Sequence, residues 1–145
     1  MEARGVVKFL GQGAGKVQAL RGVDLTLHNG ELALLMGPSG SGKTTLLSVL
    51  GCILSPSEGV VRVCGNPTTN LGPEQLAKLR REHIGFVFQS FHLFPTLIAL
   101  DNVRLALDVR GEHSSKAVKR SKDALARVGL AHKINSYPRE LSGGE

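Results

Sequence analysis

The chain has 145 residues, of which 41% are hydrophobic, and it carries a formal net charge of +6. This length and composition fit one soluble domain. Aromatic residues make up only 4% of the sequence, which leaves few stacking platforms for single strands, so we expect no nucleic-acid partner. No apolar run is long enough to span a bilayer and no N-terminal segment resembles a signal peptide, so we expect a cytoplasmic protein. Cys52 and Cys64 stand in no metal-ligand or redox pattern.

The N-terminal third of the sequence predicts an antiparallel sheet. Val6 to Leu10 is one candidate strand, and Val23 to Leu27 alternates apolar with polar residues as a second. The glycine-rich stretch Gly11 to Lys16 between them lacks the Ser or Thr that a phosphate loop carries after its lysine, so a flexible hairpin loop is expected. After a turn at residues 28–30, the apolar run Leu32 to Met36 predicts a buried strand.

A complete phosphate-loop pattern, G-x-x-x-x-G-K-[ST], follows that apolar run. Its glycines let successive backbone N–H groups point at one anion, and its lysine adds a mobile cation. A helix is predicted from Thr44 to Leu50, so the anion would also lie at a helix N-terminus. The pattern predicts ATP as ligand, with the Thr44 hydroxyl on a bridging Mg²⁺. The predicted phosphate-binding residues are Gly37, Pro38, Ser39, Gly40, Ser41, Gly42, Lys43, Thr44 and Thr45.

The remaining elements alternate between helices, short strands and turns. Basic residues gather between 110 and 127, where a solvated helix face is expected. The predicted strands are 60–63 and 84–88, and the predicted helices are 73–81, 102–109 and 114–128, the last ending at Gly129.

The C-terminal residues narrow the function that the phosphate loop leaves open. Leu141-Ser142-Gly143-Gly144-Glu145 resembles the signature motif of the ATP-binding-cassette (ABC) ATPases, and Tyr137 to Glu140 matches its usual lead-in. The Ser142 hydroxyl and the Gly143 and Gly144 N–H groups could form a second anion site. In the family, two cassettes pair head to tail and each signature covers the ATP of the other, so the resemblance implies a homodimer.

Two further positions resemble functional residues of this family. Gln89, after the strand predicted at 84–88, resembles the Q-loop glutamine whose amide reaches Mg²⁺ and the attacking water. Phe9 stands where the family places the aromatic residue that stacks on adenine; the alternative for Phe9 is a core position. Ile98 replaces the capping Thr of close relatives, which predicts a weaker helix cap. An apolar cluster follows Gln89 and either faces the coupling helices of a transmembrane permease subunit or packs locally: Phe91, Leu93, Phe94 and Leu97.

The resemblance implies an α/β fold of the P-loop NTPase ABC type, with an N-terminal antiparallel β subdomain, a partial parallel core sheet and a helical subdomain. Residues 1–89 would form the β subdomain and the phosphate-loop core, and residues 90–145 the helical subdomain. The Walker B strand, with its catalytic Glu, and the switch His of the family have no counterpart. We therefore expect a truncated chain that lacks the C-terminal part of the core and does not hydrolyse ATP alone.

The wording of the motifs resembles the lipoprotein-release and macrolide-export subgroup. It implies an ATP-binding subunit of a bacterial ABC exporter, peripheral on the cytoplasmic face of the inner membrane through its permease. Three alternatives remain open: a soluble ABC ATPase without a transport role, a small-molecule kinase with the same phosphate loop, and a non-enzymatic fragment that binds nucleotide weakly or not at all. The kinase would leave Gln89 and the signature residues unexplained.

Overall fold

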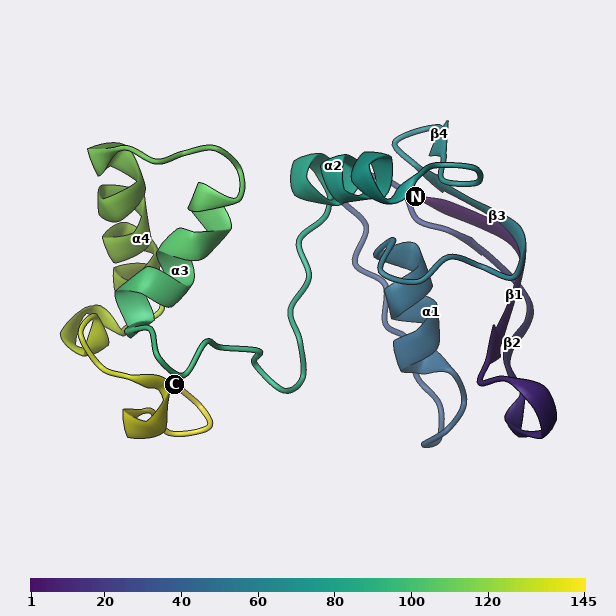
Figure 1. Ribbon diagram of the computed structural model, residues 1–145, viewed down its shortest axis with the longest axis horizontal. Helices are drawn as coiled ribbons and strands as arrows, with labels where there is room; N and C mark the ends of the chain where they lie inside the picture. The colour runs from purple at the N-terminus through teal and green to yellow at the C-terminus, as the bar shows by residue number, and fades with distance from the viewer. The chain divides into compact units, whose positions relative to one another are not determined.

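The chain, described over residues 1–145 by a computed structural model, forms two compact units, Met1–Phe86 and Val87–Glu145 (Figure 1). The first unit contains all the strands and two helices, and the second is helical. None of the helices combines the length and apolar character that crossing a membrane would require.

The first unit is built on a four-stranded antiparallel sheet of order β2-β1-β3-β4. Its central strand, β1, places Ala3 opposite Leu25 on one side and Val61 on the other. The glycine-rich stretch between β1 and β2 forms a loop with one 3₁₀ turn, η1 (Gly13–Gly15), as predicted. The strands are β1 (Glu2–Leu10), β2 (Val17–Thr26), β3 (Glu58–Val63) and β4 (Asn66–Pro67).

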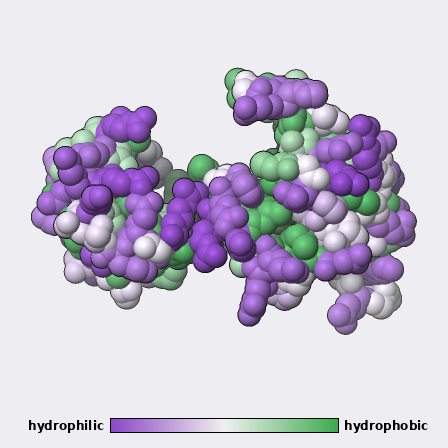
Figure 2. Space-filling view, turned by 90° about the horizontal axis from the view of Figure 1, so that it is seen from above, coloured by the Kyte–Doolittle hydropathy of each residue, from purple (hydrophilic) through white to green (hydrophobic).

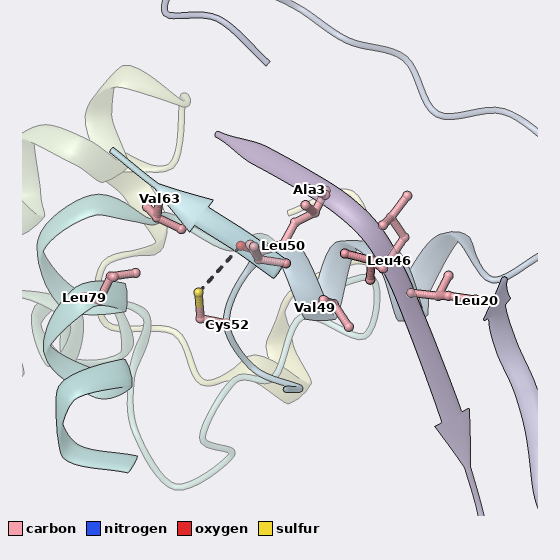
Figure 3. Close-up of a cluster of buried hydrophobic side chains, with 10 residues drawn as sticks. Ala3, Leu20, Leu46, Val49, Leu50, Cys52, Val63 and Leu79 are labelled. Atoms are coloured by element: carbon pink, nitrogen blue, oxygen red, sulfur yellow. Dashed lines mark hydrogen bonds between the residues drawn. The ribbon is translucent and has the colours of Figure 1, made fainter. Parts of the chain in front are cut away.

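Helices α1 (Lys43–Leu50) and α2 (Pro73–His83) complete the first unit, and the core contains residues of both helices and of the sheet. Figure 3 shows side chains of α1 and of the strands meeting in one cluster. Arg80 of α2 donates a hydrogen bond of 2.6 Å to the Cys52 carbonyl just after α1, which ties the two helices together. The core consists of Ala3, Val6, Leu20, Leu46, Val49, Leu50, Cys52, Val61, Val63 and Leu79.

The second unit is a pair of helices, α3 (Ala99–Asp108) and α4 (Ser115–Arg127), followed by 3₁₀ turns η2 (Ala131–Lys133) and η3 (Pro138–Glu140). Small side chains bring the helices together: Ala117 and Ser121 are 1% and 0% exposed. The Ser114 hydroxyl caps α4, and Gly129 ends it as predicted, with the N–H groups of Gly129 and Leu130 donating to carbonyls of its last turn.

Two strand predictions are wrong. Residues 32–36 and 84–88, expected in the parallel core sheet, form no strand, and Leu32 and Val87 are 98% and 96% exposed. An apolar segment becomes a strand only when a neighbour takes up its backbone hydrogen bonds, and the four strands pair only with one another. Figure 2 shows apolar patches open at the surface on the face that it displays.

Candidate functional site

The phosphate loop leads directly into α1, whose first residue is Lys43. Gly42 precedes it in the left-handed region, at φ 88°. A Cβ at Gly42 would lie 2.5 Å from the Ala19 carbonyl oxygen of β2, closer than any side chain tolerates. Glycine is therefore required here both by the turn and by the contact through which the loop rests against the sheet.

Lys43 is bonded to the loop that it follows. Its ammonium donates hydrogen bonds of 2.7 Å to the carbonyl oxygens of Gly37 and Pro38, and one of 3.4 Å to the Ser41 hydroxyl. The Ser41 N–H donates to the Pro38 carbonyl at 3.3 Å, which closes the turn. The Lys43 side chain thus folds back onto the loop, so its positive charge lies beside any anion that the loop binds.

The N-terminus of α1 offers donors to an anion. The first helical hydrogen bond runs from Leu46 N–H to the Gly42 carbonyl at 2.8 Å, which leaves the N–H groups of residues 43–45 at the open end. No side chain caps this end, and no acidic residue lies in the first turn. Backbone donors, the helix dipole and Lys43 together favour a polyanion. Thr44 is exposed in the same turn, so its hydroxyl can reach an ion beside it.

Phe9, predicted to stack on adenine, is half-buried on β1 rather than in the core. The Lys16 ammonium lies 4.2 Å from the centroid of its ring, a cation–π contact. Across the ladder, Phe9 lies opposite Gln18 of β2. The Lys16 ammonium thus covers one face of a half-buried ring, and stacking of Phe9 on a base stays a prediction.

Gln89 lies in the second unit, exposed at a turn. The rings of Phe88 and His92 stack across it, with centroids 4.3 Å apart. Phe91 and His92 both have positive φ, 59° and 52°, which is uncommon for large side chains and marks a tightly folded loop. The loop presents Gln89 with its amide exposed, and its role toward Mg²⁺ stays a prediction.

Asn102 holds the apolar cluster in place, a role that sequence reasoning missed. Its amide accepts from Phe94 N–H at 2.8 Å and donates to the carbonyls of Phe94, Leu97 and Ile98 at 2.9–3.2 Å. Ile98 itself provides no side-chain cap for α3, as predicted. The sequence offered one signal for this role: an Asn one turn after the start of a helix that has no capping residue. Its side-chain amide can form hydrogen bonds with the backbone groups that remain unpaired there.

Apolar side chains of this cluster remain open to solvent. Phe91, Leu93 and Phe94 are 62%, 45% and 53% exposed. These three side chains are therefore not part of a local core. Leu97 is half-buried. Exposed apolar side chains gathered on one loop are typical of a contact surface.

The signature residues form a turn. Ser142 N–H donates to the Glu145 carboxylate at 2.8 Å, and Glu145 N–H donates to the Ser142 carbonyl at 3.0 Å. This is half of the capping-box pattern that opens helices. The hydrogen bonds from Ser142, together with Lys133 3.6 Å away, lower the pKa of Glu145 below its ordinary value. Gly143 and Gly144 are exposed, as the anion-site prediction requires.

No group of three or more His, Cys, Asp or Glu side chains could hold a metal ion by itself. A Mg²⁺ ion would therefore depend on the nucleotide's own oxygens, with Thr44 and Gln89 as the predicted protein donors. Hydroxyl and amide oxygens suit this ion, which usually keeps few protein ligands in phosphate sites.

Comparison with known proteins shows the family of the chain. The family described as ABC transporter matches residues 20–145. The chain is 43% identical over its whole length to the macrolide export ATP-binding/permease protein MacB 1 of Aeromonas hydrophila, of which it spans 22%. It is 44% identical to an uncharacterized ABC transporter ATP-binding protein, YbbA of Escherichia coli, and 43% identical to another of Thermotoga maritima. It spans 64% and 62% of those two proteins.

Comparison with solved structures gives the same family. A dimeric ATP-binding cassette in a post-hydrolysis state, bound to ADP and Pi, superposes with a TM-score of 0.92 at 40% identity. The match covers 98% of this chain and 63% of that one. The chain thus belongs to the ABC transporter family and has the fold of its ATP-binding cassette.

Proposed function

We propose that this chain is the ATP-binding part of a bacterial ABC exporter, and that it couples ATP binding to a transmembrane permease. One observation carries the proposal: the Lys43 ammonium and the N–H groups of the uncapped first turn of α1 lie at the same glycine loop, where both can donate to an anion. The family membership supports ATP as the nucleotide, and the exporter relatives support the direction of transport.

Each site residue has a distinct task in this proposal. The loop N–H groups and Lys43 hold the β- and γ-phosphates, because both kinds of donor meet the highest negative charge of the ligand. Thr44 and Gln89 would hold Mg²⁺, which neutralises the phosphate oxygens. Phe9 would stack on the base through the ring face that Lys16 does not cover.

The partners follow from the two half-sites. Ser142, Gly143 and Gly144 are exposed donors and would cover the ATP of a second copy, which makes a homodimer the functional unit. Support comes from the solved cassette, which is dimeric. The exposed side chains of Phe91, Leu93 and Phe94 would receive the permease, and this contact would keep the protein at the cytoplasmic face of the inner membrane.

These 145 residues are expected to bind ATP without cleaving it. Hydrolysis needs a group that positions or deprotonates water beside the γ-phosphate. Gln89 is neutral and can only orient a water, and we assign no carboxylate or histidine of this chain to that role.

A fluorescent-ATP titration of the full 145-residue protein tests the proposal. Binding is expected to saturate, to compete with ATP and to be lost in Lys43→Ala, since the removed ammonium contacts the phosphates. Lys78→Ala is a matched control, because Lys78 is an exposed lysine of α2 with one weak ion pair at 4.0 Å to Glu82. Equal affinity in Lys43→Ala and the wild type would overturn nucleotide binding at the loop.

Turnover measured in the same samples tests the second half of the proposal. Phosphate release above the rate without protein, and abolished by Lys43→Ala, would contradict the expectation that catalysis is absent. Transfer of the γ-phosphate to a small molecule, rather than to water, would favour the kinase alternative.

A further inference from the structure

The sheet is irregular where it meets the phosphate loop. Lys8 lies opposite Leu20 and the next residue, Phe9, lies opposite Gln18, so Ala19 of β2 has no partner and the strand bulges. The Ala19 carbonyl is the group that approaches Gly42. Bulges redirect neighbouring side chains and are frequent beside functional sites. The bulge thus fixes the loop and Gln18 relative to each other.

A cavity of about 350 Å³ lies at this junction. Gln18 and Arg21 of β2 form one wall, and Gly40 and Ser41 of the phosphate loop form another. No acidic residue lines it, so an anionic ligand meets no repulsion there. The cavity borders the phosphate loop through Gly40 and Ser41, and its lining residue Gln18 lies opposite Phe9 on the neighbouring strand.

Gln18 is the polar side chain placed between these two parts. It is exposed, and its amide makes no hydrogen bond within the chain. An amide both donates and accepts, which matches a pair of sugar hydroxyls better than a charged group does. In a nucleotide the ribose joins the phosphates to the base, and Gln18 shares the cavity with Ser41 of the phosphate loop and lies opposite Phe9 in the sheet.

We propose that Gln18 is a ribose-binding residue of the nucleotide site, with its amide on the sugar hydroxyls of the ligand held in this cavity. This inference rests on the proposed function, because it needs a nucleotide in the phosphate loop. Arg21, at the other end of the same wall, has no ion-pair partner and adds positive charge to the cavity.

Three probes separate the parts of the ligand: ATP, 2′,3′-dideoxy-ATP without the sugar hydroxyls, and inorganic tripolyphosphate without the nucleoside. The wild type should bind ATP more tightly than the dideoxy analogue. Gln18→Leu should weaken ATP roughly fivefold, the usual effect of one or two lost hydrogen bonds. It should bind the dideoxy analogue and tripolyphosphate as the wild type does. Gln12→Leu is the matched control, since Gln12 is an exposed glutamine in the hairpin loop outside the cavity.

Each other outcome identifies what is wrong. If Gln18→Leu leaves the preference for ATP over the dideoxy analogue unchanged, the inference is overturned while the proposed function stands. The inference is also overturned if Gln18→Leu weakens tripolyphosphate as much as ATP, because the substitution then acts on the phosphate loop. If the wild type binds neither ATP nor tripolyphosphate in a Lys43-dependent way, the proposed function itself fails and the inference fails with it.

Discussion

The two units of this chain bury their apolar surface in opposite ways. The first fills the space between a sheet and two helices with large aliphatic side chains such as Val49 and Leu50. The second is a helix pair whose buried side chains are mostly small, Ala99, Ala117 and Ser121, with Leu125 as the one large buried side chain. The first unit should therefore be sensitive to lost volume and the second to added volume.

The largest effect is expected from Leu50→Ala in the first unit. Leu50 is 6% exposed in the core, so its removal should lower the free energy of unfolding by about 3 kcal/mol, from lost burial and the cavity left behind. Leu47→Ala on the same helix, where the side chain is 48% exposed, should cost less than about 1 kcal/mol. Urea unfolding, followed by hydrogen exchange of the backbone amides in β1, β2 and β3, measures the destabilisation of both variants. Equal losses of stability would contradict the view that the first unit depends on its buried aliphatic volume.

Added volume is the test of the second unit. Ala117→Leu should destabilise it by about 2 kcal/mol, because Ala117 is 1% exposed and its space is taken by the facing helix. Ala126→Leu places the same side chain on the exposed face of α4 and should be close to neutral. Protection of the α3 and α4 amides reports the difference. A Leu accepted at both positions would mean that the helices are not closely packed.

Asn102→Ala tests whether the second unit relies on polar ties where it lacks apolar bulk. Loss of the hydrogen bonds to residues 94–98 should cost about 1–2 kcal/mol and release that loop. Asn135→Ala, an exposed Asn in a turn, is the control. The readout is exchange of the Phe94 and Leu97 amides, which should accelerate only in the first variant. Unchanged protection would show that the loop is held by other contacts.

The smallest effect is expected at the signature turn, and it depends on pH. The folded pKa of Glu145 is lowered, so its contribution to the turn is complete above the ordinary value of 4.5 and is lost as the pH falls through the folded pKa. An NMR titration should show the Ser142 amide resonance shifting below pH 4.5, and Glu145→Gln should remove that shift. A Ser142 amide that titrates identically in Glu145→Gln would contradict the assignment.

Helices and their ends could be predicted because their signals are local. The helix after the phosphate loop, the stop of α4 at Gly129 and the missing cap at Ile98 all depend on residues within one or two turns. The strands predicted at 32–36 and 84–88 were wrong because strand formation depends on a neighbour distant in sequence.

The candidate site also has a part that local sequence predicts and a part that depends on contacts between distant residues. The loop residues 37–45 are contiguous, so their pattern alone predicted an anion cradle that begins a helix. Asn102 and Gln18 were missed because the roles assigned to them depend on residues that lie close only in the folded chain. Asn102 contacts the loop at 94–98, and Gln18 lines a cavity together with Ser41. A single polar residue in a helix or strand forms no sequence pattern from which such a contact could be predicted.

The hydrogen bonds of Lys43 to its own loop also set a threshold for ligands. A ligand oxygen has to replace the Gly37 and Pro38 carbonyls as acceptor before the ammonium can turn to it. A single weakly charged anion gives little in exchange, whereas a triphosphate presents several charged oxygens at once. The loop should thus discriminate by the number of charged oxygens that arrive together, which favours triphosphates over small anions with a single charged oxygen.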